Sequence, residues 1–484
     1  MKLLKVLCVV ALVFAVSTVA YAETQSVKVS GDITERAFAR NNFDLDKSDA
    51  AVDGTGTESN DWATFLLSTV EVQVDADLTD NVSGVIRLVN QRVWGDENYT
   101  AAAAGELGTT GAPISDTVVA RGAVAPGDDA YSVLVDLAYI ELKEFLYSPL
   151  TLRIGRQDLW FGKGFIIGNS LQDPSGSIWP QEYTAITSFD AIRATLDYDP
   201  WTIDAVYAKI NENARRSDDD TNLFGVNVGY IFDAYNAEME GYWWWKQDRN
   251  PDSAATGVAI TTRNGNASND VHTFGARGSF DPIEDWTVAL EVAAQAGDFL
   301  GVNFQNDGRN RSAWAIDAMV ECRYWQDDFA WRPVAAIEYI YYSGEEDMGN
   351  RSRGVNGTYH GWDVMYRGKF DTAIREFQNV FYRTTQASSP SFTNQHQLLF
   401  SGSVEPTDSL TMTAKWGIFW LAEDWSETNS DKLAGNELDL NLTWDYTEDV
   451  SFGLLAAWFF PGDHFQDGME DTATDLVGTV KLSF

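Results

Sequence analysis

The clearest signal in the sequence is a strict alternation of apolar and polar residues near the C-terminal end. Between Glu437 and Tyr446, one set of alternate positions is apolar, and it comprises Leu438, Leu440, Leu442, Trp444 and Tyr446. The other set is polar, and it comprises Glu437, Asp439, Asn441, Thr443 and Asp445. A period of two predicts a β-strand. Carboxylates on one face and leucines on the opposite face indicate water on one side of the strand and hydrocarbon on the other.

The same alternation recurs along the chain, in segments 69–78, 286–295, 410–420 and 475–484. Between residues 131 and 142 the pattern is too mixed to assign the two faces. No repeat of fixed length appears, which argues against the rival fold, a soluble secreted all-β protein such as a β-helix, a propeller or a sandwich array. We therefore predict an all-β transmembrane antiparallel barrel.

The connections between these strands alternate between two kinds. Short turns rich in Asp, Asn, Pro and Ser occur at residues 80–81, 147–149, 199–200, 233–235, 281–285, 326–328, 405–408 and 447–449. Long polar or glycine-rich loops lie between them, including 95–130, 248–270 and 343–393. Eight short turns and nine long loops give about 18 strands, with both termini on the short-turn side. We expect the short side to be periplasmic and the long side extracellular.

A barrel in hydrocarbon must close, because an open sheet would leave unpaired backbone groups at two edges. The last strand ends in Lys481-Leu482-Ser483-Phe484. A final aromatic residue on an alternating strand resembles the C-terminal signal of bacterial outer-membrane proteins. We therefore expect the barrel assembly machinery to recognise Phe484, and outer-membrane lipid and lipopolysaccharide to surround the barrel.

The N-terminus and the composition agree with export. Residues 1–22 contain Lys2 and Lys5, a short apolar run and Ala20-Tyr21-Ala22, which predicts a cleaved signal peptide followed by one barrel domain over 23–484. Cleavage removes two lysines and no acid, so the formal charge changes from −38 to −40. So acidic a chain is a poor nucleic-acid binder. Cys322 is the only cysteine after residue 22, so no internal disulfide is possible.

A motif near the predicted start of the barrel resembles a known family. Residues 152–170 read LRIGRQDLWFGKGFIIGNS and follow AYIELKEF at residues 138–145. This resembles the alginate-export family of outer-membrane porins. The resemblance implies a passive, selective pore for a hydrophilic solute, including export of an anionic polysaccharide such as alginate, with lumenal Arg and Lys residues at the constriction.

Carried over by residue, the resemblance places Arg153, Arg156 and Gln157 in a network on the pore wall. Alternation alone turns Arg153 towards the lumen, and Arg156 would need a bulge at Gly155 to share that face. A structural ion pair with a wall carboxylate is the alternative role for either arginine.

Alternation also predicts a lumen of mixed charge rather than a basic ring. The further candidate pore-lining cations are Arg87, Arg193, Arg277, Arg323, Arg332 and Lys415. The predicted inward carboxylates include Glu71, Asp204, Glu240, Glu291, Asp317, Glu338, Glu437, Asp439 and Asp475. An anionic cargo therefore follows from the resemblance and not from these charges.

The longest predicted loop, at about 343–393, is locally basic. Its candidate solute contacts are Arg351, Arg353, Arg367 and Lys369. Aromatic residues such as Trp362 and Tyr366 give it enough apolar surface to fold. We expect it to fold over or into the barrel mouth, and a purely extracellular lid is the alternative.

Other chemistry has little support in the sequence. The four histidines are scattered without a zinc-binding spacing, and no serine-hydrolase motif occurs. We expect no enzyme activity, catalytic residue, metal or cofactor. Two alternatives to a selective exporter stay open, a general or nutrient-uptake porin and a surface binding or adhesion barrel with a plugged lumen.

Overall fold

The computed structural model describes residues 26–43, 45, 62–94, 133–170, 187–212, 220–233, 235–249, 269–299, 309–323, 329–346, 358–376, 392–424, 430–465 and 469–484. The predicted signal peptide, the turn at 326–328 and the candidates Arg351 and Arg353 lie outside these residues. No helix within the described ranges is long and apolar enough to cross a membrane.

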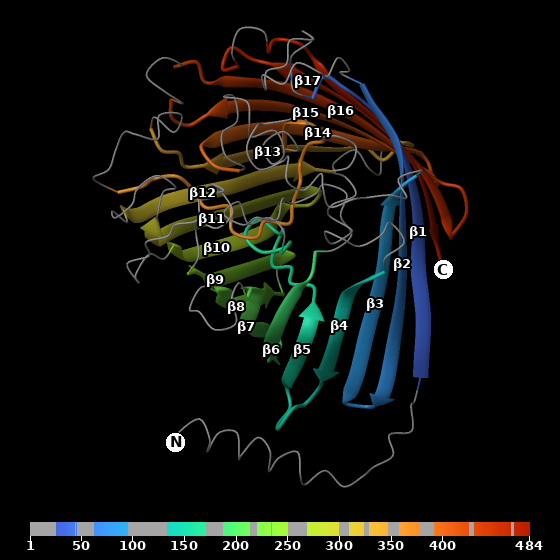
Figure 1. The fold of residues 1–484 in the computed structure, drawn as a ribbon, viewed down its shortest axis with the longest axis vertical. Helices are drawn as coiled ribbons and strands as arrows, with labels where there is room; N and C mark the ends of the chain where they lie inside the picture. The colour runs from blue at the N-terminus through green and yellow to red at the C-terminus, as the bar shows by residue number, and fades with distance from the viewer. Residues whose placement is uncertain are drawn as a thin grey trace.

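Eighteen strands form one sheet (Figure 1). The first nine are β1 (Ser26–Asn41), β2 (Trp62–Thr79), β3 (Val82–Val93), β4 (Leu134–Leu142), β5 (Leu150–Gln157), β6 (Phe189–Asp197), β7 (Trp201–Asn211), β8 (Thr221–Phe232) and β9 (Ala237–Asp248). The other nine are β10 (Asn269–Ile283), β11 (Trp286–Phe299), β12 (Arg309–Cys322), β13 (Val334–Tyr342), β14 (Gln395–Thr407), β15 (Leu410–Leu421), β16 (Leu433–Asp445), β17 (Val450–Pro461) and β18 (Ala473–Ser483). The predicted number of strands is confirmed.

Every strand pairs antiparallel with its neighbours in sequence, and β1 also pairs with β18 over ten residues from Asp32 to Asn41. This last pairing closes the barrel and leaves no free edge. Beyond the strand itself, Phe484 exchanges two backbone hydrogen bonds with Gly31, each 3.0 Å long. The predicted closure by the C-terminal strand is therefore confirmed.

The two faces of the wall are inverted relative to those of a soluble protein. On β16 the apolar Leu440 and Trp444 are 42% and 43% exposed, whereas the carboxylate of Glu437 is buried. The same holds on β9, where the apolar Met239 is 52% exposed and Lys246 is buried. Such a surface is stable only against hydrocarbon, so the predicted alternation of lipid-facing and lumen-facing residues is confirmed.

Candidate functional site

Two chain segments leave the wall and fold into the barrel. The first inward segment (158–170) follows β5, and the second (358–376) lies between β13 and β14. Their buried apolar residues, including Phe165 and Tyr366, belong to one cluster with inward-facing wall residues such as Phe189, Trp244 and Tyr342. A hydrophobic core inside the lumen therefore holds both segments, and the expectation that the long loop folds inward is confirmed for residues 358–376.

The two inward segments are also paired with each other through the backbone. Ile167 and Tyr366 form a parallel bridge. The N–H of Gly168 donates to the carbonyl of Tyr366 at 2.7 Å, and the N–H of Gly368 donates to the carbonyl of Gly164 at 2.9 Å. A Cβ on Gly168 would lie only 2.8 Å from the Cα of Gly368. Glycine is therefore required here, because the two backbones are in contact.

Asp363 anchors the second inward segment to one side of the wall. Its carboxylate accepts hydrogen bonds from the Lys246 ammonium at 2.8 and 2.9 Å and lies 3.7 Å from the Arg311 guanidinium. Its backbone N–H donates to Gln295 at 2.8 Å. Burial alone would raise the pKa of Asp363, but Lys246 and Arg311 outweigh it and hold the pKa below its usual range.

A second anchor lies on β16. The Glu437 carboxylate accepts the backbone N–H groups of Ile374 and Arg375 at 2.6 and 2.7 Å. The Asp439 carboxylate accepts the backbone N–H of Ala373, the residue before Ile374, at 3.2 Å. From neighbouring β15, the predicted pore-lining Lys415 donates to the backbone carbonyl of Asp371. Lys415 therefore faces the lumen as predicted and contacts the second inward segment.

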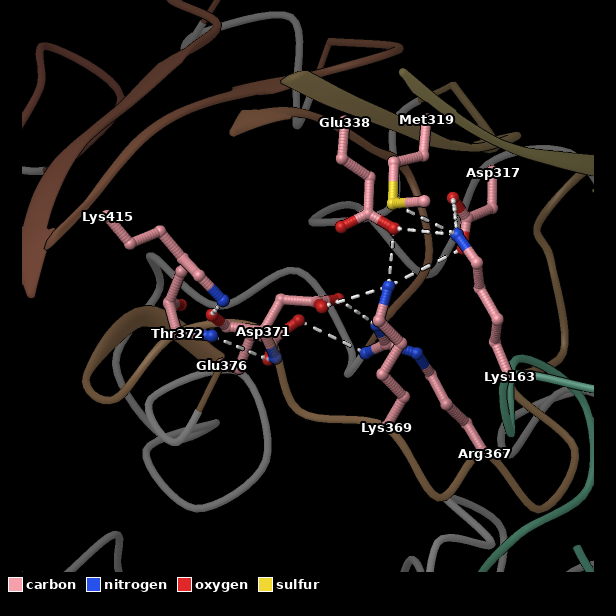
Figure 2. Close-up of polar contacts among 10 residues, drawn as sticks. All are labelled: Lys163, Asp317, Met319, Glu338, Arg367, Lys369, Asp371, Thr372, Glu376 and Lys415. Carbon is pink, nitrogen blue, oxygen red and sulfur yellow. Dashed lines mark hydrogen bonds and ion pairs between the residues drawn. The ribbon is translucent and has the colours of Figure 1, made fainter. Parts of the chain in front are cut away.

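Between these anchors lies a charge cluster that includes one lysine from each inward segment (Figure 2). The Lys369 Nζ lies 2.6 Å from Glu338 on β13 and 3.5 Å from Asp317 on β12. The Lys163 Nζ approaches the same two carboxylates at 3.4 and 3.9 Å. Lys369 also contacts Asp371 at 3.0 Å. The wall carboxylates are therefore shared between the two segments.

The opposite charges in this cluster stabilise each other's charged forms. Burial alone would lower the pKa of Lys369, but Asp371, Asp317 and Glu338 outweigh it and raise the pKa above its usual value. Burial alone would raise the pKa of Asp371, but Lys369 and other cations outweigh it and bring the pKa to about 2. Both groups are therefore charged at neutral pH.

Arg367, a predicted solute contact, is fully buried. Its guanidinium donates to Asp371 at 2.6 Å and to Glu376 at 3.1 Å, and it lies 4.2 Å from the centre of the Phe392 ring. A side chain with no exposed surface cannot touch a passing solute. We correct the prediction accordingly, because in this structure Arg367 holds the second inward segment together.

Among the wall arginines, Arg153 and Arg193 sit opposite each other on β5 and β6. The Nε of Arg153 donates to Glu141 on β4 at 3.0 Å, and the Nε of Arg193 donates to Asp204 on β7 at 2.8 Å. Arg193 also lies 4.9 Å from the centre of the Phe161 ring, in the first inward segment. Both arginines face the lumen as predicted, and both are ion-paired.

Arg87 and Arg277 also face inward and contact the first inward segment. Arg87 on β3 pairs with Asp136 on β4 and lies 3.4 Å from Asp158. Arg277 on β10 pairs with carboxylates of β9, Glu240 at 2.6 Å among them, and its side chain lies against Gly162.

Arg156 differs from the prediction. The pairing of β5 with β4 and with β6 runs without a register shift through Gly155, so no bulge turns Arg156 inward. It shares the outward face with Ile154, which is exposed, and lies 3.5 Å from Asp190. The neighbouring Gln157 is buried, and its amide donates to the carbonyl of Ala191 at 2.9 Å.

The last two candidates lie at the short-turn end of the barrel, far along the strands from the inward segments. Arg323 follows β12 and pairs with Glu321 at 2.7 Å. Arg332 lies in the connection before β13 rather than on a strand, and it pairs with Glu405 at 3.3 Å. Neither reaches the two inward segments in the described contacts.

Sequence reasoning missed Lys163, Lys246 and Arg311. Lys163 stands between Gly162 and Gly164, both with positive φ, so no period of two applies to it. The sequence Gly162-Lys163-Gly164 inside the family motif is the feature that could have marked Lys163 as a candidate. Among the described residues, no group of three or more His, Cys, Asp and Glu side chains could hold a metal ion.

Comparisons with known proteins settle the family. A family model described as alginate export matches residues 47–479. The chain belongs to the alginate-export family. With the closed 18-stranded barrel, this membership makes it an outer-membrane channel protein. A search of curated proteins gives no match.

Solved structures similar to this alginate-export family member share the fold at low identity. Acinetobacter baumannii OccAB4 is 10% identical with a TM-score of 0.55, covering 96% of this chain and 100% of that one. Pseudomonas aeruginosa OpdO is 9% identical with a TM-score of 0.55, covering 96% and 98%. The outer membrane protein opdK from Pseudomonas aeruginosa is 10% identical with a TM-score of 0.53, covering 95% and 99%.

Proposed function

We propose that this alginate-export family channel passes a hydrophilic solute passively and selectively, with an anionic polysaccharide such as alginate as the first candidate. The observation that carries the proposal is a row of fixed, partly exposed guanidiniums on one side of the lumen. The side chains of Arg87, Arg153 and Arg193 are 21%, 30% and 24% exposed while each is held by a carboxylate.

Such guanidiniums suit a carboxylated polymer. The wall carboxylate fixes the position of the planar fork, and the exposed N–H groups can still donate to a carboxylate of the solute. Weak contacts repeated along a row allow a chain to enter and also to leave, which conduction requires.

The test is a planar bilayer with purified protein. We expect polyuronate oligomers to block the ion current at lower concentration than neutral oligosaccharides of equal length. Arg153→Gln should weaken that block about tenfold, because one charge-assisted hydrogen bond contributes about 1.5–3 kcal/mol. Lys432→Gln, a partly exposed loop lysine, should leave it unchanged. Equal block by neutral and acidic sugars would contradict the anionic cargo.

A general or nutrient-uptake channel is the second candidate. It is favoured by the ion-paired state of the wall cations Arg87, Arg153, Arg193 and Arg277, which leaves no uncompensated basic ring among them. Weak selectivity between small ions, together with no preference for polyuronate, would support it.

A plugged surface barrel for binding or adhesion is the third candidate, and the hydrophobic cluster that holds the two inward segments favours it. Such a protein would insert into a bilayer without steps of current. We further propose periplasmic termini, recognition of Phe484 by the barrel assembly machinery, contact with lipopolysaccharide, and transport without enzyme activity.

A further inference from the structure

Two lysines carried by separate inward segments meet the same two wall carboxylates. Asp317 on β12 and Glu338 on β13 lie within 4 Å of both Lys163 and Lys369 (Figure 2). Neither lysine lies on a strand, and the two carboxylates tie both lysines to the wall, while Lys369 also pairs with Asp371 at 3.0 Å. One pair of wall residues thus fixes a charge on each inward segment.

The four side chains are not equally accessible. Lys163 and Lys369 are 20% and 18% exposed, whereas the Asp317 side chain has no exposed surface. Since the inward segments lie inside the barrel, a solute reaches the ammonium groups while Asp317 lies behind them. Glu338 is 14% exposed, so a solute also reaches one of the two carboxylates. The field that a solute meets therefore depends on how far Asp317 and Glu338 compensate the two ammonium groups.

The other anchors of the second inward segment do not hold an accessible cation. Lys246, which pairs with Asp363, has no exposed surface, and Glu437 binds backbone N–H groups rather than a cation. Changes at those anchors would alter stability without uncovering an accessible charge. Loss of both Asp317 and Glu338 would remove both carboxylate partners of Lys163 and leave Lys369 with Asp371 alone.

We propose that Asp317 and Glu338 determine the charge preference of the channel by compensating Lys163 and Lys369 at the inward segments. This inference rests on the proposed channel function but not on the identity of its solute. With the carboxylates in place the site is nearly balanced in charge, and without them it is basic.

The test compares two isosteric or near-isosteric double variants in planar bilayers across a KCl gradient. Asp317→Asn with Glu338→Gln should shift the reversal potential towards chloride, with at least a roughly fivefold rise in the anion-to-cation permeability ratio. Lys163→Met with Lys369→Met should shift it towards potassium. Reversal potentials that shift in opposite directions indicate a charge effect. If the substitutions only loosened the inward segments, both double variants would shift the reversal potential in the same direction.

A matched control removes two carboxylates elsewhere. Glu448→Gln with Asp449→Asn alters exposed residues in the turn between β16 and β17, and should change the permeability ratio less than about twofold because these charges are screened by salt. Heat-modifiable migration on gels should show all variants folded. A further variant, Glu338→Asp, retains a carboxylate and should therefore keep an anion-to-cation permeability ratio close to that of the wild type.

The outcomes are distinct. Shifts of equal sign in the two double variants, or an unchanged ratio in a conducting carboxylate variant, would overturn the inference and leave the channel function intact. If the carboxylate variant does not fold, Glu338→Gln alone decides, with a smaller shift of the same sign expected. A wild-type protein without current would remove the channel function and this inference together.

Discussion

At the scale of residues, the unusual feature is how many charges are buried against each other inside the lumen. Arg367 illustrates it, since its fully buried guanidinium is matched by Asp371 and Glu376. Buried charges of this kind are stable only as sets, because removing one partner leaves the others uncompensated. The lumenal interior thus resembles a protein core built from ion pairs together with aromatic rings.

Arg367→Met should release the second inward segment. The change leaves two carboxylates without their guanidinium, which costs about 3–5 kcal/mol for a buried pair. We expect hydrogen exchange of residues 358–376 to accelerate strongly while the strands stay protected. Lys432→Met is the control, since Lys432 is partly exposed. Unchanged protection in Arg367→Met would show that the ion pairs do not hold the segment.

Which residues face inward could be predicted from the sequence, but their partners could not. Alternation placed Lys415, Glu437 and Asp439 on the lumenal face, and all three do contact the second inward segment. Their partners are backbone groups of residues 371–375, which are distant in sequence and carry no periodic signal. The local excess of basic residues predicts Arg367 as a solute contact, but its burial against Asp371 and Glu376 of the same segment is not visible in the sequence.

At the scale of elements, side chains along each strand alternate between the lipid face and the lumenal face, except where the register between two strands shifts. Between 131 and 142 the faces could not be assigned, and the structure gives the reason. The β3–β4 register shifts between Arg87 and Leu88, so Asp136 has no residue opposite it, and Asp136 and Leu137 are both buried. The bulge expected at Gly155 is absent, since its positive φ is accommodated without a register shift.

A single Gly→Ala substitution can test the contact between the two inward segments. Gly168→Ala would place a Cβ 2.8 Å from the Cα of Gly368, so the two backbones must separate. Overpacking of this kind costs about 1–3 kcal/mol. We expect faster hydrogen exchange in residues 158–170 and 366–370.

Gly478→Ala is the matched control, because no atom lies within 4 Å of its added Cβ. It should leave exchange at the inward segments as in the wild type. If both alanine variants behave alike, the two segments do not depend on each other for their position.

At the scale of the whole molecule, closure of the sheet and the lipid-facing surface follow from the sequence, whereas the contents of the lumen do not. The count of turns and loops predicts 18 strands, and the apolar stripes predict the face that meets hydrocarbon. The inward segments are irregular, so neither the helical nor the strand period marks them. The aromatic residues of the long loop predict that the second inward segment folds, but nothing in the sequence predicts that the first inward segment enters the lumen. The pairing of the two segments and their anchors are seen only in the structure.

Assembly of the barrel gives a further prediction. Phe484 follows β18 and bonds to Gly31 through the backbone, so Phe484→Ala should leave the folded barrel intact in detergent. If the assembly machinery recognises the aromatic ring, the variant should reach the outer membrane at several-fold lower levels in cells. Phe452→Ala, which removes another outward aromatic ring, should assemble normally. Equal levels of the two variants in membrane fractions would exclude recognition of Phe484.

A channel function requires that this barrel enclose an aqueous path past the two inward segments. Single-channel recording of the purified protein in a planar bilayer tests it most directly. We expect discrete, reproducible steps of current on insertion, with a reversal potential that responds to the charges at Asp317 and Glu338. Insertion without any current would rule out such a path and favour a plugged barrel.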